Sequence, residues 1–103
     1  MRRLSTVIAC TLGSDDLRTQ AERWRRLQRE AGLGISETED GVRLRFRDEQ
    51  AADKELRALV AVETDCCAWA RWEIRREAGE LVLDVSSTSA GAAALQSMFR
   101  RLE

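Results

Sequence analysis

The sequence of 103 residues contains no histidine and only three cysteines. Histidine is the side chain that most often serves as a general base near neutral pH and as a metal ligand. Its absence leaves the thiols of Cys10, Cys66 and Cys67 as the first candidates for any chemistry of the chain. The sequence therefore favours thiolate chemistry over a histidine-based active site.

The chain also lacks a large net charge and a long apolar run. Its 17 basic and 18 acidic residues give a formal net charge of −1, so the overall charge gives no reason to expect nucleic-acid binding. No apolar stretch approaches the roughly 20 residues that span a membrane. The apolar fraction of 44% and the charged fraction of 34% are typical of a globular protein, and we expect residues 1–103 to form one domain.

The first residues, Met1 to Leu12, combine two arginines with a partly apolar stretch and so faintly resemble a signal peptide. Because this stretch contains Ser5, Thr6 and Thr11 and leads into turn residues, we interpret it as a strand and expect no export signal. We therefore expect a cytoplasmic protein whose cysteines are reduced, since disulfides are rare in that compartment.

Alternating or β-branched stretches predict the strands, and these cover residues 5–12, 33–38, 42–47, 70–75 and 81–85. The stretch from Val42 to Arg47 alternates at every position, which is typical of a strand with one face in water. The preceding residues Glu39, Asp40 and Gly41 favour a hairpin turn, because Asp-Gly tolerates the positive φ angles that tight turns need.

Apolar residues at helical spacing predict three helices between these strands. The first follows the N-cap Ser14 and ends at Gly32, the second follows the cap Asp48, and the last covers residues 87–102. The apolar stripe of the second helix also carries a carboxylate, that of Glu63.

The order of elements is thus β-α-β-β-α-β-β-α. Arginines at alternate strand positions imply an antiparallel sheet that exposes one face to water and is covered by helices on the other. We expect an α+β two-layer sandwich of roughly ferredoxin-like type.

The direction of each element predicts where the cysteines lie. If the strand at residues 5–12 runs upward, the hairpin at residues 40–41 makes the second helix run upward as well. Cys10 then lies near the upper end of its strand, and Cys66 and Cys67 lie at the upper end of the helix. This topology predicts three thiols close enough to share one ion.

Three thiolates without histidine suit thiophilic ions such as Hg(II), As(III) and Cd(II). Glu63 precedes the adjacent cysteines by one helical turn, so its carboxylate is placed to bind the ion or to support a ligand. We therefore expect a metal site formed by Cys10, Cys66, Cys67 and Glu63. Zinc would need a fourth ligand, which Glu63 or Asp65 can supply.

The same residues also have a simpler interpretation. A buried cysteine is usually a small apolar residue, and a helical glutamate is usually solvated and paired with a nearby arginine. Both interpretations remain alternatives to the metal site. We interpret Trp69 and Trp72 as core or dimer contacts rather than as walls of a ligand cage.

Three segments resemble small bacterial domains that occur as free-standing proteins and as C-terminal extensions of MerR-type heavy-metal regulators. These segments are Ala9–Leu12, Trp24–Leu27 and Val62–Trp69. The usual pattern of these domains is a cysteine in the first strand and Glu-x-x-Cys-Cys followed by an aromatic pair. The resemblance covers nearly the whole chain, although alanine flanks Trp69 where these domains often have proline and further aromatics. It implies a role in heavy-metal resistance or sensing, with a regulator or a second copy as partner.

A fainter similarity is to alkylmercury lyase, which also has an early Cys-x-Leu and an adjacent Cys-Cys followed by aromatics. In that enzyme an aspartate works with two cysteines to protonate the leaving carbon, but Gly13 stands where this aspartate would follow the first cysteine. We therefore expect a binding module, with an organomercurial lyase as the alternative. A regulatory or dimerisation domain whose cysteines only pack is the third interpretation.

Overall fold

The computed structural model describes residues 14–102, with side chains from Arg18 onward. The strand expected at residues 5–12 lies outside the described residues, and so does Cys10. The elements follow one another as α1 (Ser14–Ala31), β1 (Gly32–Thr38), β2 (Gly41–Arg47), α2 (Gln50–Cys66), β3 (Arg71–Glu77), β4 (Glu80–Ser86) and α3 (Ser89–Arg100).

The four described strands form one antiparallel sheet in the order β1-β2-β4-β3. The weakest prediction, a strand at residues 33–38, is confirmed by β1, which pairs with β2. A second hairpin joins β3 to β4 through Ala78 and Gly79, whose φ angles of 53° and 79° reverse the chain in two residues.

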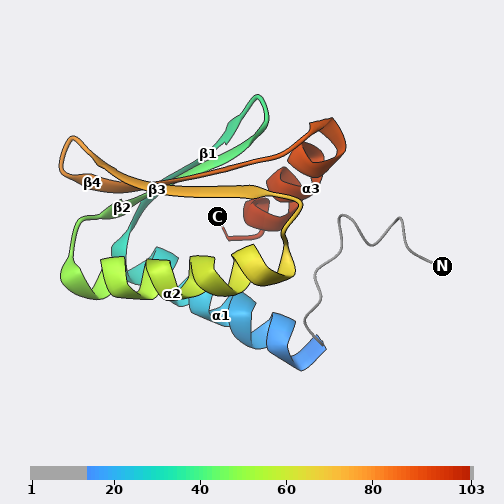
Figure 1. Ribbon diagram of the computed structural model, residues 1–103. Coiled ribbons are helices and arrows are strands. Elements are labelled where there is room, and N and C mark those ends of the chain that lie inside the picture. The colour runs from blue at the N-terminus through green and yellow to red at the C-terminus, as the bar shows by residue number, and fades with distance from the viewer. Residues whose placement is uncertain (1–13, 103) are drawn as a thin grey trace.

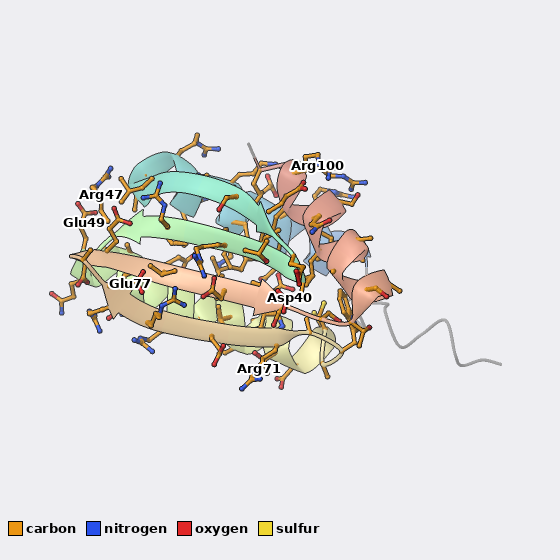
Figure 2. All side chains as sticks on the ribbon, turned by 90° about the horizontal axis from the view of Figure 1, so that it is seen from above. Asp40, Arg47, Glu49, Arg71, Glu77 and Arg100 are labelled. Atoms are coloured by element: carbon orange, nitrogen blue, oxygen red, sulfur yellow. The ribbon has the colours of Figure 1, made fainter. Side chains whose placement is uncertain are left out.

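All three described helices lie on one side of the sheet (Figure 1). The helices α1 and α2 pack against each other below the sheet, while α3 packs mainly against β2 and β4. Figure 2 looks onto the opposite side of the sheet, where no described helix covers the strands. The predicted α+β two-layer sandwich, with an antiparallel sheet and helices on one face, is therefore confirmed.

The alternating sequence of β2 explains why the sheet has one dry face and one wet face. Val42, Leu44 and Phe46 are buried against the helices, while the arginines between them are exposed. The helices complete this core with Trp24 and Phe99, whose rings meet edge to face at 5.5 Å. The core is thus aliphatic in its centre and aromatic between α1 and α3.

Two expected helix starts differ in the structure. Asp48 was expected to cap α2, but Glu49 is the N-cap and makes no side-chain capping bond. The Asp48 carboxylate instead accepts a hydrogen bond from Arg76 at 3.0 Å, because β3 brings that guanidinium beside it. Ser87 was expected to open the last helix, but its hydroxyl donates to the Trp69 carbonyl, and α3 begins at Ser89.

Within residues 14–102, no helix combines the length and the apolar character that crossing a bilayer demands.

Candidate metal centre

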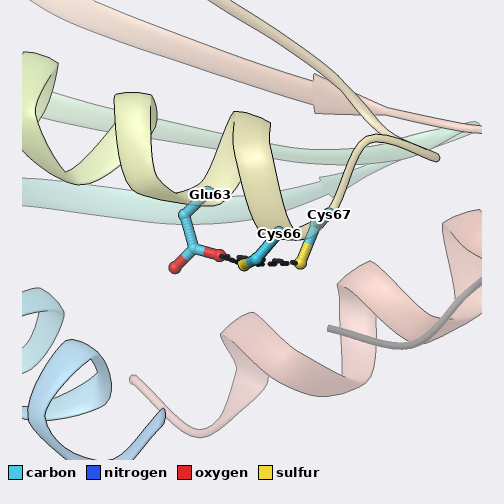
Figure 3. Close-up of side chains that lie close together, drawn as sticks. All are labelled: Glu63, Cys66 and Cys67. Atoms are coloured by element: carbon cyan, nitrogen blue, oxygen red, sulfur yellow. Dashed lines mark hydrogen bonds between the residues drawn. The ribbon is translucent and has the colours of Figure 1, made fainter. Parts of the chain in front are cut away.

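The last turn of α2 brings a carboxylate and two sulfurs together (Figure 3). Glu63 and Cys66 lie within α2, and Cys67 is the C-cap residue, whose backbone N–H donates to the Glu63 carbonyl at 2.6 Å. Residues three and four positions apart lie on the same face of a helix, so the spacing alone directs all three side chains to one side. In Figure 3 that side faces α1 and α3.

The three possible ligand atoms form a compact group. The Sγ atoms of Cys66 and Cys67 lie 3.5 Å apart, and each lies 3.7 Å from Oε1 of Glu63. All three residues are buried, with exposed fractions of 4%, 1% and 6% for Cys66, Cys67 and Glu63. Among the described residues, these three have ligand atoms that all lie within 4.8 Å of one another, close enough to bind one metal ion.

The other oxygen of Glu63 is held by helix α1. Its Oε2 accepts a hydrogen bond from the Trp24 indole N–H at 2.8 Å and another from the Gln20 side-chain amide at 3.2 Å. Gln20 also donates to the carbonyl of Leu59, one turn before Glu63. Because Oε2 is engaged in this way, Oε1 is the oxygen that faces the sulfurs.

Gln20 was not among the predicted site residues. The sequence nevertheless indicates a role for Gln20, because it lies four residues before Trp24 and so shares the same helical face. A polar side chain on an apolar stripe indicates a buried hydrogen-bond partner, since buried polar groups are nearly always paired. Here the partner is the equally anomalous carboxylate on the stripe of α2, that of Glu63.

The two described cysteines differ in their chemical state. Cys66 takes part in a disulfide bond, whereas Cys67 is a free thiol. The expectation of a reduced thiol at Cys66 is therefore wrong for this structure.

Burial raises the pKa of the Cys67 thiol from its ordinary value of 9.0 to about 12, and the nearby Glu63 charge and hydrogen bond act in the same direction. The Cys67 side chain is consequently a neutral thiol at pH 7, able to donate its proton towards Glu63. An ion that binds here must displace this proton, as metal ions commonly do at cysteine sites.

The structure thus brings together three of the four predicted ligands, Glu63, Cys66 and Cys67. The fourth, Cys10, lies outside the described residues, so its predicted place beside them stays a prediction. The alternative of a solvated Glu63 is wrong, because the residue is buried. Asp65 is exposed and does not belong to the group.

The two tryptophans after the cysteine pair pack against the core, as expected. Trp72 meets Phe99 edge to face with ring centroids 6.1 Å apart, and its indole N–H donates to the Cys67 carbonyl at 3.4 Å. Trp69 is half-buried, and its carbonyl accepts the hydrogen bond from Ser87. These contacts fix the chain just beyond the cysteines, where α2 ends.

No protein-family model, curated protein or solved structure matches this chain. The case for a function therefore depends on the chemistry of the group at the end of α2.

Proposed function

We propose that the chain is a binding module for a thiophilic metal or metalloid ion, such as Hg(II), As(III) or Cd(II). The observation that carries the proposal is the buried group of two sulfurs and one carboxylate oxygen at the end of α2. In the proposal the ligands are Cys66 and Cys67, with Cys10 as a third thiolate and Glu63 in support. The biological role is heavy-metal resistance or sensing.

Ligand chemistry supports a soft ion over a hard one. Thiolates select soft ions, while Mg²⁺ and Ca²⁺ prefer sites built from several oxygens. The group offers two sulfurs but only one oxygen that faces them, because Oε2 of Glu63 already accepts two hydrogen bonds. Burial also keeps competing water away from the ion.

Loading of the site requires two chemical changes in the protein. The disulfide at Cys66 must be reduced before its sulfur can bind an ion, and the neutral thiol of Cys67 must lose its proton. Metal affinity should therefore depend on the reductant and rise with pH, since the ion competes with protons for the sulfurs. The resemblance to extensions of MerR-type regulators further suggests a regulator, or a second copy, as the protein partner.

The test is a titration of the reduced protein with Hg(II), As(III) and Cd(II), monitored by thiolate-to-metal charge-transfer absorption. We expect saturation at one ion per chain, with strong weakening in Cys66→Ser and in Cys67→Ser. Asp65→Asn is the matched control, because this carboxylate is adjacent in sequence but exposed, and its replacement should leave the titration unchanged.

A specific observation favours the packing interpretation as the second candidate. Cys67 is among the most deeply buried side chains, with an exposed fraction of 1%, as a purely structural cysteine would be. If the folded, reduced protein shows no charge-transfer band with any of the three ions, packing is the correct account. Circular dichroism of each cysteine variant distinguishes lost ligands from lost folding.

A further inference from the structure

A pocket of about 270 Å³ lies between α1 and the end of α3, and neither of the described cysteines lines it. Its walls are largely apolar and are formed by Ala21, Trp24, Met98, Phe99 and Leu102. The volume is close to the lower end of the range of about 300–1,000 Å³ that is usual for small-molecule sites. The pocket is therefore large enough for a short hydrocarbon chain or a single ring.

The walls of the pocket are fixed by contacts within the protein. The rings of Trp24 and Phe99 meet edge to face at 5.5 Å. The Trp24 indole N–H and the Gln20 amide donate to Oε2 of Glu63 at 2.8 and 3.2 Å, which orients both side chains. The pocket thus exists before a ligand enters, so that binding needs little ordering of side chains.

Two arginines also line the pocket, Arg25 from α1 and Arg101 just beyond α3. Most of the described arginines pair with a carboxylate, as Arg23 does with Glu55 at 2.9 Å. Within residues 14–102, the side chains of Arg25 and Arg101 make no ion pair and no hydrogen bond. These two exposed guanidiniums are therefore free to bind an anion.

The charges are ordered along the depth of the pocket. The acidic residue in the lining, Glu63, is only 6% exposed, whereas Arg25 and Arg101 are exposed. The pocket is thus negative at its buried side and positive at its exposed side. An anionic head group is attracted to the exposed side and repelled from the buried side, so that an apolar tail enters first.

We propose that this pocket binds a small amphipathic carboxylate, such as a medium-chain fatty acid. The tail contacts Trp24, Phe99 and Leu102, and the carboxylate binds Arg25 and Arg101. Binding is non-covalent and involves no sulfur. The proposal therefore goes beyond the metal site and does not depend on it.

The test is a titration of the full chain with octanoate below its micelle concentration, monitored through the indole N–H signals in NMR spectra. The indole of Trp24 belongs to the pocket wall, whereas Trp69 does not line the pocket and serves as an internal control. We expect a saturable shift of the Trp24 signal and no shift of the Trp69 signal. The proposal is wrong if no signal shifts saturably, or if only that of Trp69 does.

The role of the head group is tested with 1-octanol and octylammonium, which have the same chain without the negative charge. We expect octanoate to bind at least about fivefold more tightly than octanol, and octylammonium to bind most weakly. High salt should reduce the difference, because the guanidiniums are exposed. Equal affinities for octanoate and octanol would contradict the anion site.

Replacement of both arginines tests the position of the carboxylate. The double variant Arg25→Gln, Arg101→Gln should bind octanoate about fivefold more weakly and octanol unchanged. Arg29→Gln is the matched control, since Arg29 is exposed one turn later on α1 but does not line the pocket. A folded double variant that still prefers octanoate over octanol would overturn the proposal.

Pocket-filling variants test the position of the tail. Ala21→Phe should remove the binding of octanoate and of octanol alike, because the ring occupies the apolar space. Leu102→Trp fills the same space from the other wall and is used if Ala21→Phe does not fold. Ala93→Phe, on an exposed position of α3, should leave both affinities unchanged. If a folded pocket-filling variant binds octanoate as the wild type does, the tail lies elsewhere and the proposal is wrong.

Discussion

Carboxylates occur in two contrasting settings in this molecule, the open face of the sheet and the buried end of α2. On the open face (Figure 2), Asp84 accepts a hydrogen bond from Arg43 at 2.7 Å, and Glu80 accepts one from Arg45 at 3.1 Å. At the end of α2, Glu63 receives its hydrogen bonds from the uncharged side chains of Trp24 and Gln20. Among the described ion pairs, none includes Glu63.

The two settings differ because water can replace the lost partner of an exposed carboxylate but cannot reach a buried one. An exposed ion pair is screened and solvated, so its loss costs at most about 1 kcal/mol. A buried acceptor that loses its donor costs about 1–3 kcal/mol, because no water reaches it. The buried carboxylate should therefore be sensitive to small changes in its partners, whereas the open face should tolerate them.

The largest effect is expected for Trp24→Phe. This change removes the 2.8 Å hydrogen bond to Oε2 of Glu63 and leaves a buried carboxylate with one donor fewer. We expect a loss of about 1–3 kcal/mol in the free energy of unfolding, measured by urea denaturation.

The matched control is Trp72→Phe, which removes the same volume from a half-buried tryptophan whose N–H makes a longer, 3.4 Å bond to a backbone carbonyl. Its cost should be clearly smaller. Equal losses in the two variants would mean that volume, and not the hydrogen bond to Glu63, determines the effect.

An effect of similar size is expected from alkaline pH. The unfolded Cys67 thiol ionises near its ordinary pKa of 9.0, but the folded one keeps its proton up to a pKa of about 12. Stability should therefore fall as pH rises between these values, by about 1.4 kcal/mol per pH unit, because the unfolded state binds fewer protons.

The composition makes this effect easy to measure. The chain has no tyrosine and a single lysine, Lys54, so few other side chains titrate in the same range. Denaturation of the wild type and of Cys67→Ala should be compared between pH 8 and pH 10.5. The same decline in both proteins would assign it to groups other than Cys67.

The smallest effect is expected on the open face. Arg45→Gln removes a guanidinium whose side chain is 46% exposed and pairs with Glu80. The free energy of unfolding should change by less than about 1 kcal/mol, and the change should shrink in high salt. A loss as large as that of Trp24→Phe would remove the contrast between the two settings.

The fold could be predicted from the sequence because its signals are local. The alternation from Val42 to Arg47 identifies a half-buried strand without reference to any distant residue. The turn before it was predicted only approximately: it lies at Glu39 and Asp40, Gly41 is the first residue of β2, and neither Asp40 nor Gly41 has the expected positive φ angle. The predicted N-cap of α2, Asp48, was wrong because its carboxylate accepts a hydrogen bond from Arg76, a residue 28 positions away. Only the folded sheet brings these two side chains together.

The same distinction between local signals and long-range contacts applies to the candidate site. The spacing of Glu63, Cys66 and Cys67 within one helical turn was enough to predict that they meet. The hydrogen bonds to Glu63 come from Trp24 and Gln20, which are 39 and 43 positions away, and helical periodicity cannot show which residue of another helix they face. The oxidised state of Cys66 was not predictable, because composition indicates a compartment but not a bond.

The hydrogen bonds from α1 to Glu63 also couple ligand binding at the end of α2 to the docking of α1 on α2. A local opening that lifts α1 from α2 takes both donors away from the carboxylate, so the site keeps its geometry only while α1 is docked. By thermodynamic linkage, a ligand that needs Oε1 of Glu63 in place must in turn hold α1 closed. Ligand binding at the end of α2 should therefore slow amide hydrogen exchange along α1, whose donors to Glu63 lie 39 or more residues earlier in the chain.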